Sequence, residues 1–257
     1  MTATRGQGGV ATLAEPAVEF LAAARRGLDE LEAREGTALA TASAWTADAI
    51  EAGGLVRIFG TGHSRLLAEE VFFRAGGLAP TDAILEDAVS GYHDVTKSEL
   101  TERLEGYGQL IIEHRRLAPP DVLIIVSQSG RNAVPIDVAD AARARGVRTI
   151  GITSIAHARD QPSRHSSGRH LHEAVDLVID NGAPIGDCAV TLANGVPMGP
   201  LSGVLGAAIM QALVIGAAHE LLARGVEPPV FRSGNMDGGR EISQQLLDRY
   251  WDRIRGW

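Results

Sequence analysis

The sequence predicts an α/β protein in which helices cover both faces of a central parallel sheet. This arrangement is a three-layer sandwich, to which further helices are added at the N- and C-terminal ends. Two observations support this fold class. Short apolar runs alternate with segments of helical periodicity along most of the chain. One run, VLIIV at residues 122–126, is continuously aliphatic, which is typical of a parallel strand buried on both faces.

The size and composition of the chain fit one large domain. It has 257 residues, of which 45% are hydrophobic, enough for a well-filled core. We expect residues 1–52 to form a tail and helices, residues 53–225 the core, and residues 226–257 a C-terminal helical extension. Residues 1–9 are polar and Gly-rich, so we interpret them as a loose tail and not as a signal peptide.

Charge and cysteine content limit the partners and the compartment. The net charge of −8, without a dense run of Lys and Arg, argues against nucleic acid or an anionic membrane as the main partner. Cys188 is the only cysteine, which favours a reducing cytoplasm. Residues 199–218 carry no charge, but their Gly and Ala content and the polar Ser202 and Gln211 favour a buried helix over a membrane span.

The first predicted element is helical and covers residues 12–52. Val18, Leu21, Leu28 and Leu31 recur at helical spacing. A break is expected near Gly36 and Thr37, giving two helices or one broken helix. The apolar stripe suits either packing on the core or a dimer seam.

Strands and helices then alternate. Strands are expected at residues 55–59, 83–85, 122–126, 147–152 and 175–179. Helices are expected at residues 64–75, 98–117, 133–145, 201–223 and 241–254. Residues 153–173, rich in Ser, His and Arg, are predicted to be a loop that covers a site. Ligands of such a sheet belong at the carboxyl ends of its strands.

The strand at residues 55–59 is followed by a loop that suits an anion. Its residues are Gly60, Thr61, Gly62, His63 and Ser64. Glycines let the backbone turn sharply and approach a ligand, and the N–H groups at the start of the next helix favour negative charge. Ser64 would add a hydroxyl donor, or serve only as an N-cap. The loop lacks the third glycine of a dinucleotide site and the lysine of a nucleoside-triphosphate loop.

A second loop, after the strand at residues 122–126, repeats the design with more donors. It contains Ser127, Gln128, Ser129 and Gly130, and Asn132 stands where it can cap the next helix or reach the same anion. Many neutral donors can hold a phosphate dianion even in an acidic protein. The two loops together therefore predict a phosphate site.

The GTGHS loop, the SQSG loop and the spacing between them resemble the sugar isomerase (SIS) domain family, whose members bind phosphosugars. The resemblance covers about residues 55–223 and implies a flavodoxin-like fold. In relatives such as glucosamine-6-phosphate synthase, the corresponding serines, the Gln between them and a following hydroxyl residue hold the phosphate. Carried over, these positions are Ser64, Ser127, Gln128, Ser129 and Asn132, where Asn132 replaces the Thr of many relatives.

Three further motifs resemble a branch of bacterial SIS proteins near the N-acetylmuramic acid 6-phosphate etherases and the glucokinase regulators. They are LEGYG at residues 104–108, HSSG at residues 165–168 and VIDNGAPIGD at residues 178–187. This resemblance implies an N-acetylated amino-sugar phosphate as the ligand.

Isomerisation and elimination of a phosphosugar both begin with removal of a proton next to the carbonyl, which requires a base. Glu86 follows a strand end, with His93 a few residues later, and related enzymes often carry a Glu or His on this segment. Glu70, in the helix after the first loop, is a competing base. Glu86 and Glu70 are also compatible with solvated surface carboxylates.

His165 is a candidate for ring opening or for protonation of a leaving group, since His titrates near neutral pH. With His170 and His172 it forms a cluster that lacks a Cys or carboxylate pattern with ligand spacing, so we expect no metal. No cofactor is expected either.

The resemblance to the etherases favours elimination of the C3 group from an N-acetylglucosamine 6-phosphate-like substrate. The chain lacks the Gly-Pro-Glu and Thr-Gly-Ser-Thr-Arg signature of the etherases, which disfavours lactate as the leaving group and favours a dehydratase. The alternatives are an aldose-ketose phosphosugar isomerase and a non-catalytic phosphosugar sensor. SIS proteins commonly place their sites between subunits, so we expect a homodimer or homotetramer with shared sites.

Overall fold

The computed structural model describes residues 13–254, and its centre is a five-stranded parallel sheet in the order β2-β1-β3-β4-β5. The strands are β1 (Val56–Gly60), β2 (Thr81–Ile84), β3 (Val122–Val126), β4 (Arg148–Thr153) and β5 (Leu177–Asp180). The strand order reverses between β1 and β3, and a crevice for a ligand forms at the carboxyl ends of such a pair. The tail predicted for residues 1–9 lies outside the described residues.

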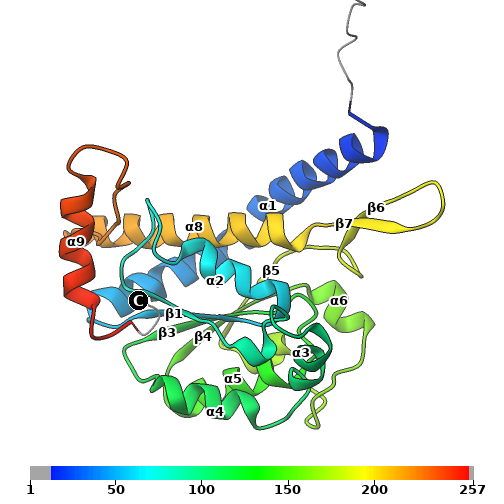
Figure 1. The fold of residues 1–257 in the computed structure, drawn as a ribbon, viewed down its shortest axis with the longest axis horizontal. Helices are drawn as coiled ribbons and strands as arrows, with labels where there is room; N and C mark the ends of the chain where they lie inside the picture. The colour runs from blue at the N-terminus through cyan, green and yellow to red at the C-terminus, as the bar shows by residue number, and fades with distance from the viewer. Residues whose placement is uncertain (1–12, 255–257) are drawn as a thin grey trace, which may run out of the picture.

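Helices cover both faces of the sheet (Figure 1). One face carries α1 (Glu15–Glu51), α2 (Arg65–Val71) and α8 (Ser202–Ala223), and the other carries α4 (Tyr107–Arg115), α5 (Ala133–Ala144) and α7 (Leu171–Ala174). Successive strand residues point to opposite faces, so Ile58 belongs to the first core layer and Phe59 to the second. The predicted three-layer α/β sandwich is confirmed.

A buried ion-pair cluster fixes the start of three strands. Arg57 of β1 pairs with Asp82 of β2, and its Nε lies 3.1 Å from Oδ2 of Asp121, just before β3. The other carboxylate oxygen of Asp121 accepts a 2.8 Å hydrogen bond from the Leu55 N–H. The side chain of Asp82 is fully buried, so its charge depends on Arg57 for compensation.

The break predicted at Gly36 and Thr37 is wrong, because α1 is one continuous helix of 37 residues. A glycine inside a helix costs only about 1 kcal/mol, and the packing of α1 on α8 offsets it. The apolar stripe of α1 is buried in one part of the helix and exposed in another. Leu31 is buried in the core, as expected for intramolecular packing, whereas Val18 and Leu21 nearer the N-terminus are exposed.

The helix predicted at residues 98–117 is two helices, α3 (Val95–Thr101) and α4. They are separated at Gly106, which has a φ of +82° and whose N–H donates to Oδ2 of Asp137 at 2.6 Å. The helix predicted at residues 64–75 ends four residues early, as α2. The segment at residues 153–173 contains α6 (Ile155–Asp160) and α7.

A hairpin of β6 (Cys188–Thr191) and β7 (Pro197–Pro200), absent from our prediction, projects beside the N-terminal part of α1 (Figure 1). The hairpin packs against α1, and at Gly199 a Cβ atom would lie 2.7 Å from the Phe20 ring.

Helix α8 is long and apolar enough to cross a membrane, but it packs against α1 and α2 and contributes to the main core, as predicted for a buried helix. Helix α9 (Gly239–Tyr250) closes the opposite end of the fold, where Tyr250 and Ile254 are buried against Leu55 and Phe231.

Candidate functional site

A cavity of about 640 Å³ opens at the carboxyl ends of β1 and β3. Its size lies in the range of roughly 300–1,000 Å³ that is typical of small-molecule sites. Residues of both predicted loops line it, together with the start of α8 and the segment after β5. All five side chains predicted to hold a phosphate are among them: Ser64, Ser127, Gln128, Ser129 and Asn132.

The first loop needs glycine for steric reasons. A Cβ atom on Gly60 would lie 2.6 Å from backbone atoms of Ser64, so only glycine lets the chain turn this tightly out of β1. Gly62 has a φ of +52° and begins the short helix η1 (Gly62–Ser64). The Ser64 hydroxyl makes no capping hydrogen bond to α2 and has no other partner among the described residues, so it is available to a ligand.

The second loop is closed by Ser127, whose Oγ accepts a 3.3 Å hydrogen bond from the N–H of Gly130. Gly130 has a φ of +59°, and a Cβ atom there would lie 2.8 Å from Oγ1 of Thr153. The hydroxyl and the N–H of Ser129 have no hydrogen-bond partner in the described part of the chain. The closed turn thus leaves Ser129 donors for a ligand in the cavity.

The first turn of α5 offers fewer donors than a helix N-terminus usually does. The N–H of Val134 donates to the carbonyl of Glu102 at 3.1 Å, and Pro135 has no N–H. An anion in this cavity would therefore depend mainly on the loop and on side-chain donors.

Gln128 is oriented by a chain of hydrogen bonds through Asn181. The N–H of Ala183 can only donate, and it donates to Oδ1 of Asn181 at 3.0 Å. Asn181 therefore presents its Nδ2 group, which donates to Oε1 of Gln128 at 2.6 Å. The Nε2 group of Gln128 is left buried without a partner. A buried donor without a partner costs free energy, so this group favours an acceptor in the cavity.

Asn132 occupies the N-cap position of α5 without making a capping hydrogen bond. Its Oδ1 accepts a 3.0 Å hydrogen bond from Nη1 of Arg164. Burial, followed by the charge of Arg131, lowers the pKa of Arg164. Because the carbonyl oxygen of Asn132 is used, its Nδ2 group is the side-chain atom left to donate to a ligand.

Two carboxylates of the cavity already have several donors. Asp187 accepts hydrogen bonds from the N–H groups of Leu201 and Ser202 and from the Ser202 hydroxyl, so it holds the start of α8. Glu70, one of the predicted bases, accepts from Nε2 of Gln211 at 3.0 Å and pairs with Arg74.

Glu102 is a third carboxylate of the cavity, and our sequence analysis missed it. Its side chain accepts a hydrogen bond from the Thr61 hydroxyl of the first loop, and its carbonyl accepts from Val134 beside the second. Glu102 is thus positioned by both loops. The residue follows the last residue of α3, a position hidden by the single helix predicted at residues 98–117.

Glu86 and His93 lie outside the lining of this cavity. Oε1 of Glu86 accepts a 2.7 Å hydrogen bond from the Tyr107 hydroxyl. Burial, followed by this hydrogen bond, raises the pKa of Tyr107 to about 12. The side chain of His93, beyond η2 (Asp87–Val89), is 64% exposed, 3.7 Å from Asp87.

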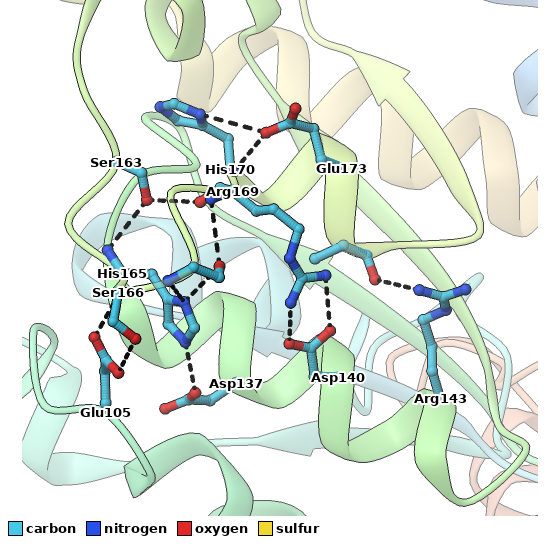
Figure 2. A network of polar contacts seen from close by, with 12 residues as sticks. Glu105, Asp137, Asp140, Arg143, Ser163, His165, Ser166, Arg169, His170 and Glu173 are labelled. Atoms are coloured by element: carbon cyan, nitrogen blue, oxygen red, sulfur yellow. Dashed lines mark hydrogen bonds and ion pairs between the residues drawn. The ribbon is translucent and has the colours of Figure 1, made fainter.

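His165 also lies outside the cavity lining, in a polar network on α5 that Figure 2 shows. Its Nε2 lies 3.2 Å from Oδ1 of Asp137, and its Nδ1 lies 2.7 Å from the Ser167 hydroxyl. Ser166 bonds to Glu105 in the same network. Residues 161–170 are therefore fastened to the outer side of α5. The catalytic roles suggested for Glu86, His93 and His165 stay predictions.

Comparison with protein families and curated proteins gives consistent matches. A family model described as the SIS domain matches residues 19–154. A UPF0309 protein of Geobacillus kaustophilus is 44% identical over 217 residues, covering 84% of this chain and 86% of that protein. A UPF0309 protein of Streptomyces coelicolor is 40% identical over 243 residues, covering 93% of this chain and 97% of that protein.

Solved structures with the same fold bind or convert sugar phosphates. Phosphoheptose isomerase from Neisseria gonorrhoeae superposes with a TM-score of 0.52 at 15% identity, covering 81% of this chain and 98% of that chain. The Vibrio vulnificus NanR protein, complexed with ManNAc-6P, superposes with a TM-score of 0.50 at 15% identity, covering 93% of this chain and 70% of that chain. At such identity the likeness establishes the fold alone.

Proposed function

The chain belongs to the SIS domain family, and from this premise we propose that it is a phosphosugar enzyme acting in the cytoplasm. Its proposed substrate is an N-acetylhexosamine 6-phosphate, and its first chemical step is removal of the proton on C2, next to the carbonyl carbon. The observation that carries the proposal is one cavity lined by both serine-bearing loops and by Glu102.

The phosphate is assigned to the second loop. Nε2 of Gln128 is a buried donor that lacks an acceptor, and Ser129 adds two donors that the fold does not use. The hydroxyl of Ser64 faces the same cavity from the first loop. A phosphate dianion accepts many hydrogen bonds at once, so it suits this group of neutral donors.

Glu102 is the base that we propose for the proton on C2. Only one of its carboxylate oxygens receives a hydrogen bond from the described residues, from Thr61, so the other is free to accept the proton from C2. Glu70, the one base candidate from the sequence that lines the cavity, is the alternative, although Gln211 and Arg74 already bind it.

Elimination of the C3 group after proton removal is the favoured continuation, because of the resemblance to the etherase branch. Glu102 takes the C2 proton, the C2–H electrons form the C2–C3 double bond, and the C3–O bond breaks. The leaving oxygen keeps that electron pair and takes a proton from His63 or water. Isomerisation would share the first step, whereas a phosphosugar sensor would share only the binding.

The test is incubation of the protein with N-acetylglucosamine 6-phosphate in D₂O, followed by NMR and mass spectrometry. Deuterium at C2 of the recovered substrate reports reversible removal of the C2 proton, whereas the elimination product itself carries no hydrogen at C2. A product lighter by one water supports elimination, whereas a new sugar isomer that has gained one carbon-bound deuterium supports isomerisation. Binding with neither exchange at C2 nor a new product would overturn the enzyme proposal and favour the sensor.

Variants identify the base in the same assay. Glu102→Gln is expected to abolish exchange while keeping phosphate binding. If Glu70→Gln or Glu86→Gln abolishes exchange and Glu102→Gln does not, our assignment of the base is wrong.

We also propose that the protein is a homodimer or homotetramer, as the sequence suggested. Val18, Leu21 and Leu28 are exposed along one side of α1, and Val196 and Met198 are exposed on the neighbouring hairpin. Covering such side chains is favourable. Light scattering should give at least twice the mass of one chain, and Leu21→Glu should lower that mass; a wild-type monomer would refute the proposal.

A further inference from the structure

A second cavity, of about 380 Å³, lies beside the first. It is bounded by η1, by α3 and by the residues just before α3. His63, Leu66 and Glu102 line both cavities, so the two are neighbours with these side chains at their common boundary. We propose that the second cavity binds a neutral sugar ring attached to the phosphorylated sugar. The proposal rests on the phosphate site of the first cavity, and it makes the substrate a phosphorylated disaccharide.

The wall of the second cavity offers a stacking surface. Tyr92 is 73% exposed, and the guanidinium carbon of Arg65 lies 5.3 Å from the centroid of its ring, covering one face. The His93 ring makes a T-shaped contact with Tyr92, with 5.0 Å between the ring centroids, and the exposed remainder of the Tyr92 ring is accessible to a ligand. Leu66 and Val95 are exposed in the same cavity. A sugar ring presents C–H groups on one face, and such groups pack favourably on the electron-rich face of an aromatic ring.

The charges of the second cavity favour a neutral group over a second anion. Arg65 supplies the guanidinium group in the lining of this cavity, and it is already paired with Glu69. Glu99 is paired with Arg103. The second carboxylate oxygen of Glu102 accepts no hydrogen bond from the described residues. A phosphate or carboxylate in this cavity would be repelled by Glu99 and Glu102, whereas a neutral sugar ring would not.

Two glycines that approach each other closely form part of the wall of the second cavity. Gly62 and Gly91 both have positive φ, of +52° and +71°, and both line the second cavity. A Cβ atom on Gly91 would lie 4.0 Å from the Cα of Gly62. Because neither residue has a side chain, bare backbone forms this part of the cavity and leaves room for a ring.

The test compares the affinities of three ligands by calorimetry. One is N-acetylglucosamine 6-phosphate, and the other two carry a second N-acetylglucosamine on the phosphorylated residue, through the oxygen at C3 or at C4. We expect one disaccharide to bind roughly tenfold more tightly than the monosaccharide. Tyr92→Ala should remove that gain, Tyr92→Phe should keep it, and neither should change binding of the monosaccharide.

A blocking variant gives an independent result. Val95→Trp, at an exposed position, should fill the second cavity and weaken binding of the disaccharide alone. If the monosaccharide binds and neither disaccharide binds more tightly, the second ring site is refuted while the phosphate site stands. If none of the three ligands binds, the proposed function fails as well.

Discussion

Asn181→Asp is the sharpest perturbation of the phosphate site, because it should turn the Gln128 amide around. In the wild type, Asn181 donates to Oε1 of Gln128 and accepts from Ala183. An aspartate keeps the acceptor for Ala183 but places a second oxygen opposite Oε1. Gln128 should then rotate to donate Nε2 to the new carboxylate, and present Oε1 to the phosphate.

The expected magnitude follows from the loss of one hydrogen bond to a charged group. Such a bond contributes about 1.5–3 kcal/mol, so the Kd of N-acetylglucosamine 6-phosphate, measured by calorimetry, should rise roughly 10- to 150-fold. Asn235→Asp introduces the same charge at an exposed position at the α9 end of the molecule, and should leave the Kd unchanged.

A double-mutant cycle separates the rotation of Gln128 from the added charge. In a Gln128→Leu background no amide remains to turn, so Asn181→Asp should then raise the Kd by much less. An equal effect of Asn181→Asp in both backgrounds would refute the proposed orientation of Gln128, and an unchanged Kd in the single variant would refute it too.

Three further predictions concern stability. Gly60→Ala should lower the free energy of unfolding by about 1–3 kcal/mol in urea titrations, because the added Cβ atom meets the Ser64 backbone. Gly36→Ala, in open space on α1, should not lower it. A larger loss for Gly36→Ala than for Gly60→Ala would contradict the packing described. Arg57→Met should lower the free energy of unfolding by about 3–5 kcal/mol, because it leaves the buried carboxylates of Asp82 and Asp121 unpaired. A decrease of less than about 1 kcal/mol would contradict this prediction. Burial and a hydrogen bond raise the pKa of Tyr107 from 10.0 to about 12, so this tyrosine stabilises the fold fully below pH 10.0 and loses that effect as the pH rises toward about 12. The free energy of unfolding of the wild type should therefore fall relative to Tyr107→Phe over that pH range, and parallel curves would exclude the effect.

The sheet and both loops could be predicted because their signals are local. Most strands contain a short apolar run, and Gly60 and Gly130 follow two of these runs where a tight turn is required. The hairpin of β6 and β7 could not be predicted, because each of its strands is only four residues long and β7 contains Pro and Gly.

The polar residues that complete the site depend on tertiary contacts. Asn181 lies 53 positions from Gln128 in the sequence, so no spacing argument links the two. Glu102 sits inside a region with continuous helical periodicity, and the helix is interrupted where Gly106 adopts a positive φ and donates to Asp137. Conversely, Glu86 and His93 follow a strand end as a catalytic residue often does, but they lie outside the cavity lining.

The central claim is that the two loops hold the phosphate of a sugar, and calorimetric titration of the wild-type protein tests it most directly. N-acetylglucosamine 6-phosphate should bind, N-acetylglucosamine without the phosphate should bind at least tenfold more weakly, and Ser129→Ala should weaken only the phosphorylated ligand. Equal affinity for the two sugars, or binding of the phosphorylated sugar that is indifferent to Ser129→Ala, would contradict the claim.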